Sequence, residues 1–162
     1  MSSAPARLTA QEFHKFAPAA NAAFASLGEA VANSGLEADL LELIKIRASQ
    51  INGCAFCIQY HLNGARKISI PAEKLDLLAA WREAGIFSDR EKAALAWTEL
   101  LTRLSQHHVS DHDYAAVSAH FAPSELAWLS TSIALINTWN RIAAPFQYAP
   151  LIPKQARELT HA

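Results

Sequence analysis

The sequence has little cysteine: Cys54 and Cys57 are the only two among its 162 residues. Two cysteines this close together cannot staple distant parts of a fold, so a disulfide-built scaffold is excluded. In a reducing compartment such a pair serves chemistry rather than architecture. The pair is therefore the first candidate for a functional site.

An excess of one charge is also missing. Fourteen Lys and Arg against fifteen Asp and Glu leave a formal net charge of -1. Such a chain has no broad positive field to attract nucleic acid or an anionic membrane surface. We therefore expect no nucleic-acid partner and no membrane partner.

The sequence also lacks long hydrophobic runs. The segment from Met1 to Leu8 has no apolar stretch of the kind that a secretory signal requires, and no lipidation pattern. The most apolar later stretch, residues 126–139, is interrupted by Ser130 and Asn137 and is shorter than the ~20 residues of a membrane-spanning helix. We expect a cytoplasmic protein in which this stretch is a buried core helix.

Strand-like alternation is nearly absent, whereas apolar residues recur at three- and four-residue spacing. The pattern predicts an all-α fold, a helical bundle of six or seven helices in one domain over residues 1–162, with a core of about 8–147 and a tail of 148–162. An example of the spacing is the series Phe13, Phe16, Ala20, Ala23, Phe24, Leu27 and Val31.

Helix start and stop signals subdivide the rest of the chain. We expect a seventh helix that ends before Pro145, followed by a tail that lies extended on the surface or across a neighbouring subunit. The remaining signals are a helix over 37–51 stopped by Asn52-Gly53, a helix from about Cys54, a helix from Pro71 to Gly85, capping boxes at Ser88/Glu91 and Ser110/Asp113, and a helix start at Pro123.

The two cysteines share a helix face with a histidine. At 100° per residue, Cys54, Cys57 and His61 lie within a sector of roughly 60°. Cys57 and His61 are four residues apart, so the imidazole should take the thiol proton and favour a Cys57 thiolate. Cys54 lies in the first turn, where free N–H groups stabilise an anion. Both sulfurs thus have a reason to be acidic, and their spacing allows a disulfide.

A carboxylate should join this group from the preceding helix. The Asn52-Gly53 turn predicts an antiparallel helical hairpin, in which Glu42 lies near the level of His61. A carboxylate there would orient the imidazole and raise its basicity. The expected relay runs from Glu42 through His61 to Cys57 and Cys54.

Other interpretations of these residues stay open. Glu42, Cys54, Cys57 and His61 could complete a zinc tetrahedron, although most structural zinc sites draw their ligands from two separated pairs. The segment 107–113, rich in His and Asp, is better explained by helix capping than by metal binding. Packing is the expected role of Trp81, Trp97, Trp128 and Trp139, whereas Gln50, Gln59, Tyr60 and Asn140 could either line the mouth of a site or serve structure.

At these residues the sequence resembles the alkyl hydroperoxidase D-like group of the carboxymuconolactone decarboxylase superfamily. The motif of that group is a Glu, a C-x-x-C twelve positions later and a His four after the second Cys, which corresponds here to Glu42, Cys54, Cys57 and His61. The resemblance extends over roughly 8–147, through Leu78–Glu83, Glu91–Trp97 and Ile136–Ile142.

The resemblance implies an all-helical fold, assembly as trimers or hexamers, and a peroxidase, an oxidoreductase acting on hydroperoxide without metal or organic cofactor. It implies that Cys57 attacks the peroxide and that Cys54 resolves the sulfenic acid, an order that the residues alone leave open. A lipoyl or thioredoxin-like dithiol would supply the electrons.

One position departs from the group. Its best-known peroxidases carry a second His immediately before the second Cys, where this chain has Phe56, so a relay through that position is lost. We expect weaker peroxidase activity or a different substrate. The alternatives are a non-enzymatic redox or zinc-binding protein, and a lyase of the decarboxylase branch, which generally lacks the C-x-x-C.

Overall fold

The computed structural model describes residues 6–153, and within them the chain is helical with no strand, as predicted. These residues form eight α-helices and one 3₁₀ turn. The helices are α1 (Ala10–Phe16), α2 (Pro18–Ala32), α3 (Ala38–Ile51), α4 (Ala55–Lys67), α5 (Ala72–Asp76), α6 (Asp89–Thr102), α7 (Asp111–Ser118) and α8 (Pro123–Phe146), and the 3₁₀ turn η1 is Leu78–Ala80.

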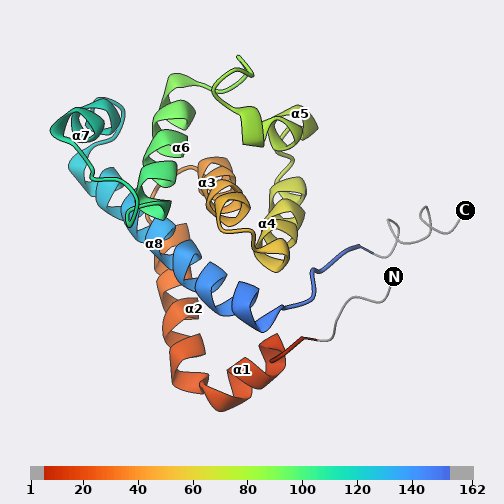
Figure 1. The fold of residues 1–162 in the computed structure, drawn as a ribbon. Helices are drawn as coiled ribbons and strands as arrows, with labels where there is room; N and C mark the ends of the chain where they lie inside the picture. The colour runs from red at the N-terminus through yellow and green to blue at the C-terminus, as the bar shows by residue number, and fades with distance from the viewer. Residues whose placement is uncertain (1–5, 154–162) are drawn as a thin grey trace, which may run out of the picture.

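Helix α3 lies at the centre of the fold and packs against α4, α6 and α8 (Figure 1). It is apolar on most of its circumference, and each side enters a different cluster of buried residues. Leu41 packs with residues of α6, α7 and α8, Leu43 with residues of α4, α5 and α6, and Ala48 with residues of α4 and α8. The third cluster contains both cysteines, so the candidate site is part of the buried core.

A buried carboxylate ties α3, α6 and the segment after η1 together. Glu99 accepts hydrogen bonds from Arg47 Nε at 2.8 Å, Trp81 Nε1 at 2.9 Å and Arg82 Nη1 at 2.7 Å. Burial opposes its charge, but the bonds from Trp81, Arg82 and Arg47 hold the pKa of Glu99 below its usual range. These bonds satisfy a charge that would otherwise be costly to bury.

Several helix ends confirm the sequence signals. Ser88 with Glu91 and Ser110 with Asp113 form the expected reciprocal capping boxes. The region of Phe13 to Val31 is divided, however, because Ala17 leaves the helical conformation and Pro18 begins α2. The segment after Pro71 also forms only the short α5 and η1 before Gly85 turns the chain with a φ of 68°.

The expectation that the last helix ends before Pro145 is wrong. Helix α8 continues to Phe146, because a proline in the final turn removes only one backbone donor there. The N-terminal segment supports this turn: Arg7 Nη1 donates to the carbonyl of Pro145 at 3.2 Å, and the Arg7 N–H donates to that of Phe146 at 3.0 Å.

In the described part of the tail, residues 148–153, Tyr148 is buried and most of the residues after it are exposed. Asn63 Nδ2 on α4 donates to the carbonyl of Leu151 at 2.9 Å, which fixes this segment beside the helix that carries the cysteines. The rest of the predicted tail, residues 154–162, lies outside the described residues.

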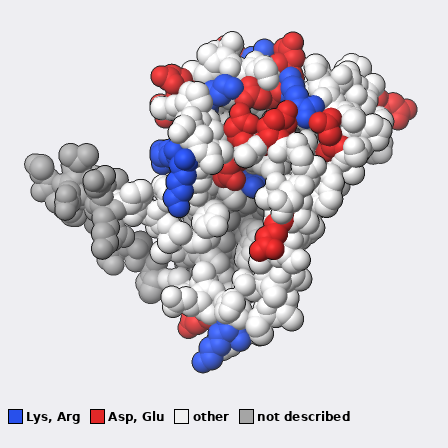
Figure 2. All heavy atoms as spheres, turned by 180° about the vertical axis from the view of Figure 1, so that it is seen from behind, with Lys and Arg blue, Asp and Glu red and all other residues white. Residues whose placement is uncertain are grey.

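Charged side chains of both signs gather on the face shown in Figure 2, and they form no continuous basic surface there. In the part of the chain that the structure describes, no helix is both long and apolar enough to span a membrane.

Candidate active site

The site is built around the turn between α3 and α4. Gly53 adopts a φ of 66°, a left-handed conformation that glycine reaches without strain. The N–H of Gly53 bonds to the carbonyl of Gln50 at 3.2 Å, and the N–H of Cys54 bonds to that of Ser49 at 3.0 Å. This pair of bonds is a Schellman motif, so Cys54 completes the C-terminal cap of α3.

Cys54 is also the N-cap of α4. Its backbone is extended, and its Sγ accepts the N–H of Cys57 at 3.4 Å. The thiol thereby stands where the unpaired N–H groups of a helix N-terminus favour negative charge. Both cysteines are free thiols and buried, with exposed fractions of 1% for Cys54 and 4% for Cys57.

The two sulfurs share one proton unequally. The hydrogen bond from the Cys57 thiol, together with the Cys57 N–H and the Asn140 amide, overcomes burial and lowers the pKa of Cys54 to about 7. The same hydrogen bond raises the pKa of Cys57, as do burial and the charge on Cys54. These shifts favour the first negative charge on Cys54, which occupies the helix N-cap and accepts the Cys57 N–H. The expected activation of Cys57 by His61 stays a prediction.

The hairpin brings Glu42 and His61 together as predicted. Glu42 Oε2 lies 2.9 Å from His61 Nδ1, and Glu42 Oε1 accepts a bond from Lys45 Nζ at 3.1 Å. Despite burial, the contacts with His61 and Lys45 hold the pKa of Glu42 below its usual range. A carboxylate at Nδ1 favours the tautomer with its proton on that nitrogen, which leaves Nε2 as an acceptor.

His61 makes no hydrogen bond to either sulfur among the residues that the structure describes, although it shares their helix. The expected direct bond between His61 and Cys57 is therefore not formed in this state. A proton passing between them would need a bridging molecule, such as a substrate oxygen or a water.

Helix α4 comes close to α3 at Gly64. A Cβ built there would lie 3.0 Å from Glu42 Oε2, the oxygen that contacts His61. Glycine therefore leaves the space in which the carboxylate lies. Sequence reasoning missed this residue, because a glycine inside a helix usually signals only lower helix propensity.

Helix α8 supplies a buried amide network behind the thiols. Asn52 Nδ2 donates to the side-chain oxygens of Asn137 and Asn140 at 2.9 and 2.8 Å, and Asn140 Nδ2 donates to Ser49 Oγ at 3.0 Å. Asn140 is only 2% exposed, so it lies behind the sulfurs rather than at a mouth. These bonds lock α8 onto the turn that presents Cys54.

Two aromatic residues, Phe56 and Tyr148, pack in the cluster that contains the dithiol. Phe56, which stands in place of a histidine, meets the ring of Tyr148 edge to face with centroids 5.4 Å apart. Tyr148 is buried with Cys54 and Cys57 in one cluster. Nothing local in the sequence identified Tyr148, because it follows the end of α8 about ninety residues after the cysteines.

The other candidate residues lie apart from the thiols or make structural contacts. Gln50 accepts a bond from Arg47, Gln59 donates to Asn63, and Tyr60 is exposed and stacks on Phe56. Trp97 donates to Ser130, and Phe13 and Phe24 pack on Trp139. Within residues 6–153, no group of three or more His, Cys, Asp or Glu side chains is arranged to hold a metal ion.

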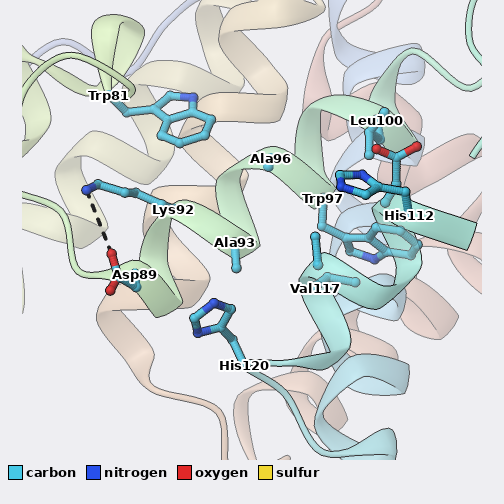
Figure 3. Close-up of a pocket in the computed structure, with 12 residues that line it drawn as sticks. Trp81, Asp89, Lys92, Ala93, Ala96, Trp97, Leu100, His112, Val117 and His120 are labelled. Atoms are coloured by element: carbon cyan, nitrogen blue, oxygen red, sulfur yellow. Dashed lines mark ion pairs between the residues drawn. The ribbon is translucent and has the colours of Figure 1, made fainter. Parts of the chain in front are cut away.

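A hollow of about 430 Å³ lies away from the cysteines. It lies between α6 and α7, where His112, His120 and Val117 face Trp97 and Ala93 (Figure 3). None of the four predicted site residues lines it. The chemistry of the dithiol therefore depends on the residues that surround the two sulfurs, not on this hollow.

The chain is similar in sequence to known proteins. A model of the carboxymuconolactone decarboxylase family matches residues 18–100, just over half of the chain. The uncharacterized protein YdfG of Bacillus subtilis (strain 168) is 36% identical over 131 residues, which cover 81% of this chain and 89% of YdfG.

Solved structures share the fold. A protein of unknown function from Agrobacterium tumefaciens, proposed to be the antioxidant defence protein AhpD, has a TM-score of 0.86 at 34% identity, covering 92% of this chain and 100% of its own. An uncharacterized peroxidase-related protein from Ralstonia eutropha JMP134, described as an alkylhydroperoxidase AhpD core, has a TM-score of 0.75 at 23% identity, covering 86% and 74%. The chain therefore belongs to the carboxymuconolactone decarboxylase family, as an AhpD-like member.

Proposed function

We propose that the protein is a thiol-dependent peroxidase that reduces an organic hydroperoxide with Cys54 and Cys57. The observation that carries the proposal is the position of Cys54 at the N-cap of α4, where its sulfur accepts the N–H of Cys57 at 3.4 Å, one helical turn from a second buried thiol. In this position the pKa of Cys54 is lowered to about 7. A thiolate at neutral pH is the nucleophile that peroxide chemistry requires. A neighbouring thiol can then resolve the oxidised sulfur as a disulfide.

In the proposed reaction, the Cys57 proton moves first to Cys54, which keeps the pair at one negative charge. Cys57, the more exposed and the more basic of the two sulfurs, then attacks the terminal oxygen of the hydroperoxide. An S–O bond forms, the O–O bond breaks and the sulfur gives up two electrons. The departing alkoxide receives the proton of Cys54 through Nε2 of His61, with a water or a substrate oxygen bridging the sulfur and the imidazole, while Glu42 stabilises the transient imidazolium.

Resolution and reduction complete the proposed cycle. The Cys54 thiolate attacks the Cys57 sulfenic acid, the S–O bond breaks as an S–S bond forms, and the hydroxide that leaves takes a proton from the solvent and becomes water. An external dithiol of the lipoyl or thioredoxin-like type then attacks Cys57, because the less basic Cys54 thiolate is the better leaving group. The donor becomes a disulfide, and both cysteines return to the reduced form.

The test follows organic hydroperoxide consumption by the purified protein with dihydrolipoamide or reduced thioredoxin. The wild-type protein should turn over, Cys57→Ser should not, and Cys54→Ser should stop after one equivalent with a trapped sulfenic acid. No consumption with any dithiol would remove the peroxidase proposal. Stoichiometric zinc in the purified protein would favour the zinc-binding alternative, and turnover of a lactone without either cysteine would favour the lyase.

A further inference from the structure

Tyr148 is held over the dithiol by the C-terminal cap of α8. Gln147 adopts a left-handed φ of 56°, and the N–H of Tyr148 bonds to the carbonyl of Ala143 at 3.1 Å. These are features of a Schellman motif, whose last residue commonly packs back on its helix. Tyr148 does so, and the same cluster contains Ala143, Cys54 and Cys57.

The ring of Tyr148 is held from both sides. Phe56 meets it edge to face at 5.4 Å between centroids, and Phe146 stacks on it at 6.4 Å. The chain three residues later is fixed by the bond from Asn63 to Leu151. With the ring constrained in this way, the position of the phenolic oxygen is set by the fold.

The hydroxyl of Tyr148 is buried and has no hydrogen-bond partner in the structure. Tyr148 as a whole is only 6% exposed. An unsatisfied buried hydroxyl destabilises the folded protein, and phenylalanine at this position would avoid that cost. Buried polar groups are rarely left without a hydrogen-bond partner. The unpartnered Tyr148 hydroxyl, in one cluster with two thiols, therefore points to an acceptor that a bound substrate would supply.

Tyr148 packs in one cluster with Cys57, and the charge of that thiol acts on its hydroxyl. Burial raises the pKa of Tyr148, and negative charge on Cys57 raises it further. The phenol thus keeps its proton at neutral pH and can donate to an oxygen at that sulfur. No other charged or titratable group raises or lowers its pKa noticeably among the described residues.

We propose that the Tyr148 hydroxyl donates a hydrogen bond to the oxygen that Cys57 takes from the hydroperoxide. This inference rests on the proposed peroxidase function and adds a catalytic residue to it. The bond orients the terminal oxygen for attack while the S–O bond forms and the O–O bond breaks. It then stabilises the same oxygen as it leaves as hydroxide when Cys54 closes the disulfide. Tyr148 keeps its own proton throughout.

Tyr148→Phe tests the proposal, because it keeps the ring and removes only the hydroxyl. The rate constant for oxidation by cumene hydroperoxide should fall roughly 10-fold, the loss expected when one hydrogen bond that orients the attacked oxygen is removed. Alkylation of the reduced protein by iodoacetamide should keep its rate, because iodide leaves without such a donor. Resistance to urea should stay equal or rise, since a buried unsatisfied hydroxyl is gone.

Tyr114→Phe is the matched control, because Tyr114 lies exposed on α7 away from the dithiol. It should leave all three measurements unchanged. An unchanged peroxide rate in Tyr148→Phe, or an equal loss in alkylation, would overturn the role of Tyr148 while leaving the peroxidase proposal intact. A wild-type protein that does not react with cumene hydroperoxide or any other hydroperoxide would instead remove both.

Discussion

Replacing Gly64 with alanine perturbs the contact between Glu42 and His61 without changing either residue. The new Cβ would lie 3.0 Å from Glu42 Oε2 and 3.5 Å from Glu42 Cδ. The carboxylate would have to retreat by a few tenths of an ångström, but Lys45 restrains its other oxygen at 3.1 Å. The bond from His61 Nδ1, now 2.9 Å long, is therefore the contact that should lengthen.

The size of the effect follows from the strength of that bond. A hydrogen bond to a charged group contributes about 1.5–3 kcal/mol net, and losing part of it costs about 1 kcal/mol. If the bond supports proton transfer in the rate-limiting step, 1 kcal/mol corresponds to a loss of about five-fold in rate. Folding should suffer less, because alanine in a helix gains about 0.5–1 kcal/mol over glycine, which offsets the crowding.

The assay compares the second-order rate constant for hydroperoxide with the free energy of unfolding from urea titration. Gly28→Ala is the matched control, because a Cβ at Gly28 on α2 would meet only Leu135 Cδ2 at an ordinary 3.9 Å. It should gain similar helix propensity with no loss of rate. A folded Gly64→Ala protein that reacts as fast as the wild type would refute the role of the Glu42–His61 contact.

Three further outcomes can be measured on the same protein. The rate of thiol alkylation should rise with pH, with a midpoint at about 7 that reports the pKa of Cys54. Cys57→Ala should raise this midpoint by more than Cys57→Ser, because serine keeps a side-chain donor for Cys54. Equal midpoints near 7 in both variants would contradict the role of the Cys57 side chain in lowering the pKa of Cys54. His61→Ala should slow the peroxide reaction by roughly 10²- to 10⁴-fold. Adding Glu42→Gln to His61→Ala should slow it little further, since the effects of residues acting as a unit are non-additive. Fully additive losses would mean that Glu42 and His61 only pack together and do not act as a unit. Mild oxidation should remove two hydrogens from the protein's mass as Cys54 and Cys57 join, whereas separate sulfenic or sulfinic acids would count against a disulfide.

Quaternary structure gives one more prediction. The family resemblance predicts trimers or hexamers, so light scattering should give three or six times the subunit mass of 17.7 kDa. A stable monomer at micromolar concentration would contradict it.

The features that the sequence predicted are those decided by local geometry. The spacing of Cys54, Cys57 and His61 is fixed by one helix, and the Asn52-Gly53 turn sets the level at which Glu42 meets that helix. Capping boxes are equally local, because each is closed within four residues. The fold class followed from periodicity alone.

The features that the sequence did not reveal depend on distant contacts. The last turn of α8, which includes Pro145, is supported by Arg7, which is far away in the chain and donates to the carbonyls of Pro145 and Phe146. Tyr148 reaches the dithiol only through the cap of that helix. The order of the two thiol pKa values depends on which sulfur donates the shared proton, and a linear pattern carries no information about that direction.

The dual position of Cys54, which closes α3 and begins α4, bears on how this hairpin can evolve. Serine, asparagine and aspartate are the residues that N-cap positions prefer, and each could replace Cys54 while preserving both helix ends. A lineage could thus lose its redox chemistry by a single substitution without losing the architecture. Proteins that share this fold can therefore carry out reactions that need no thiol.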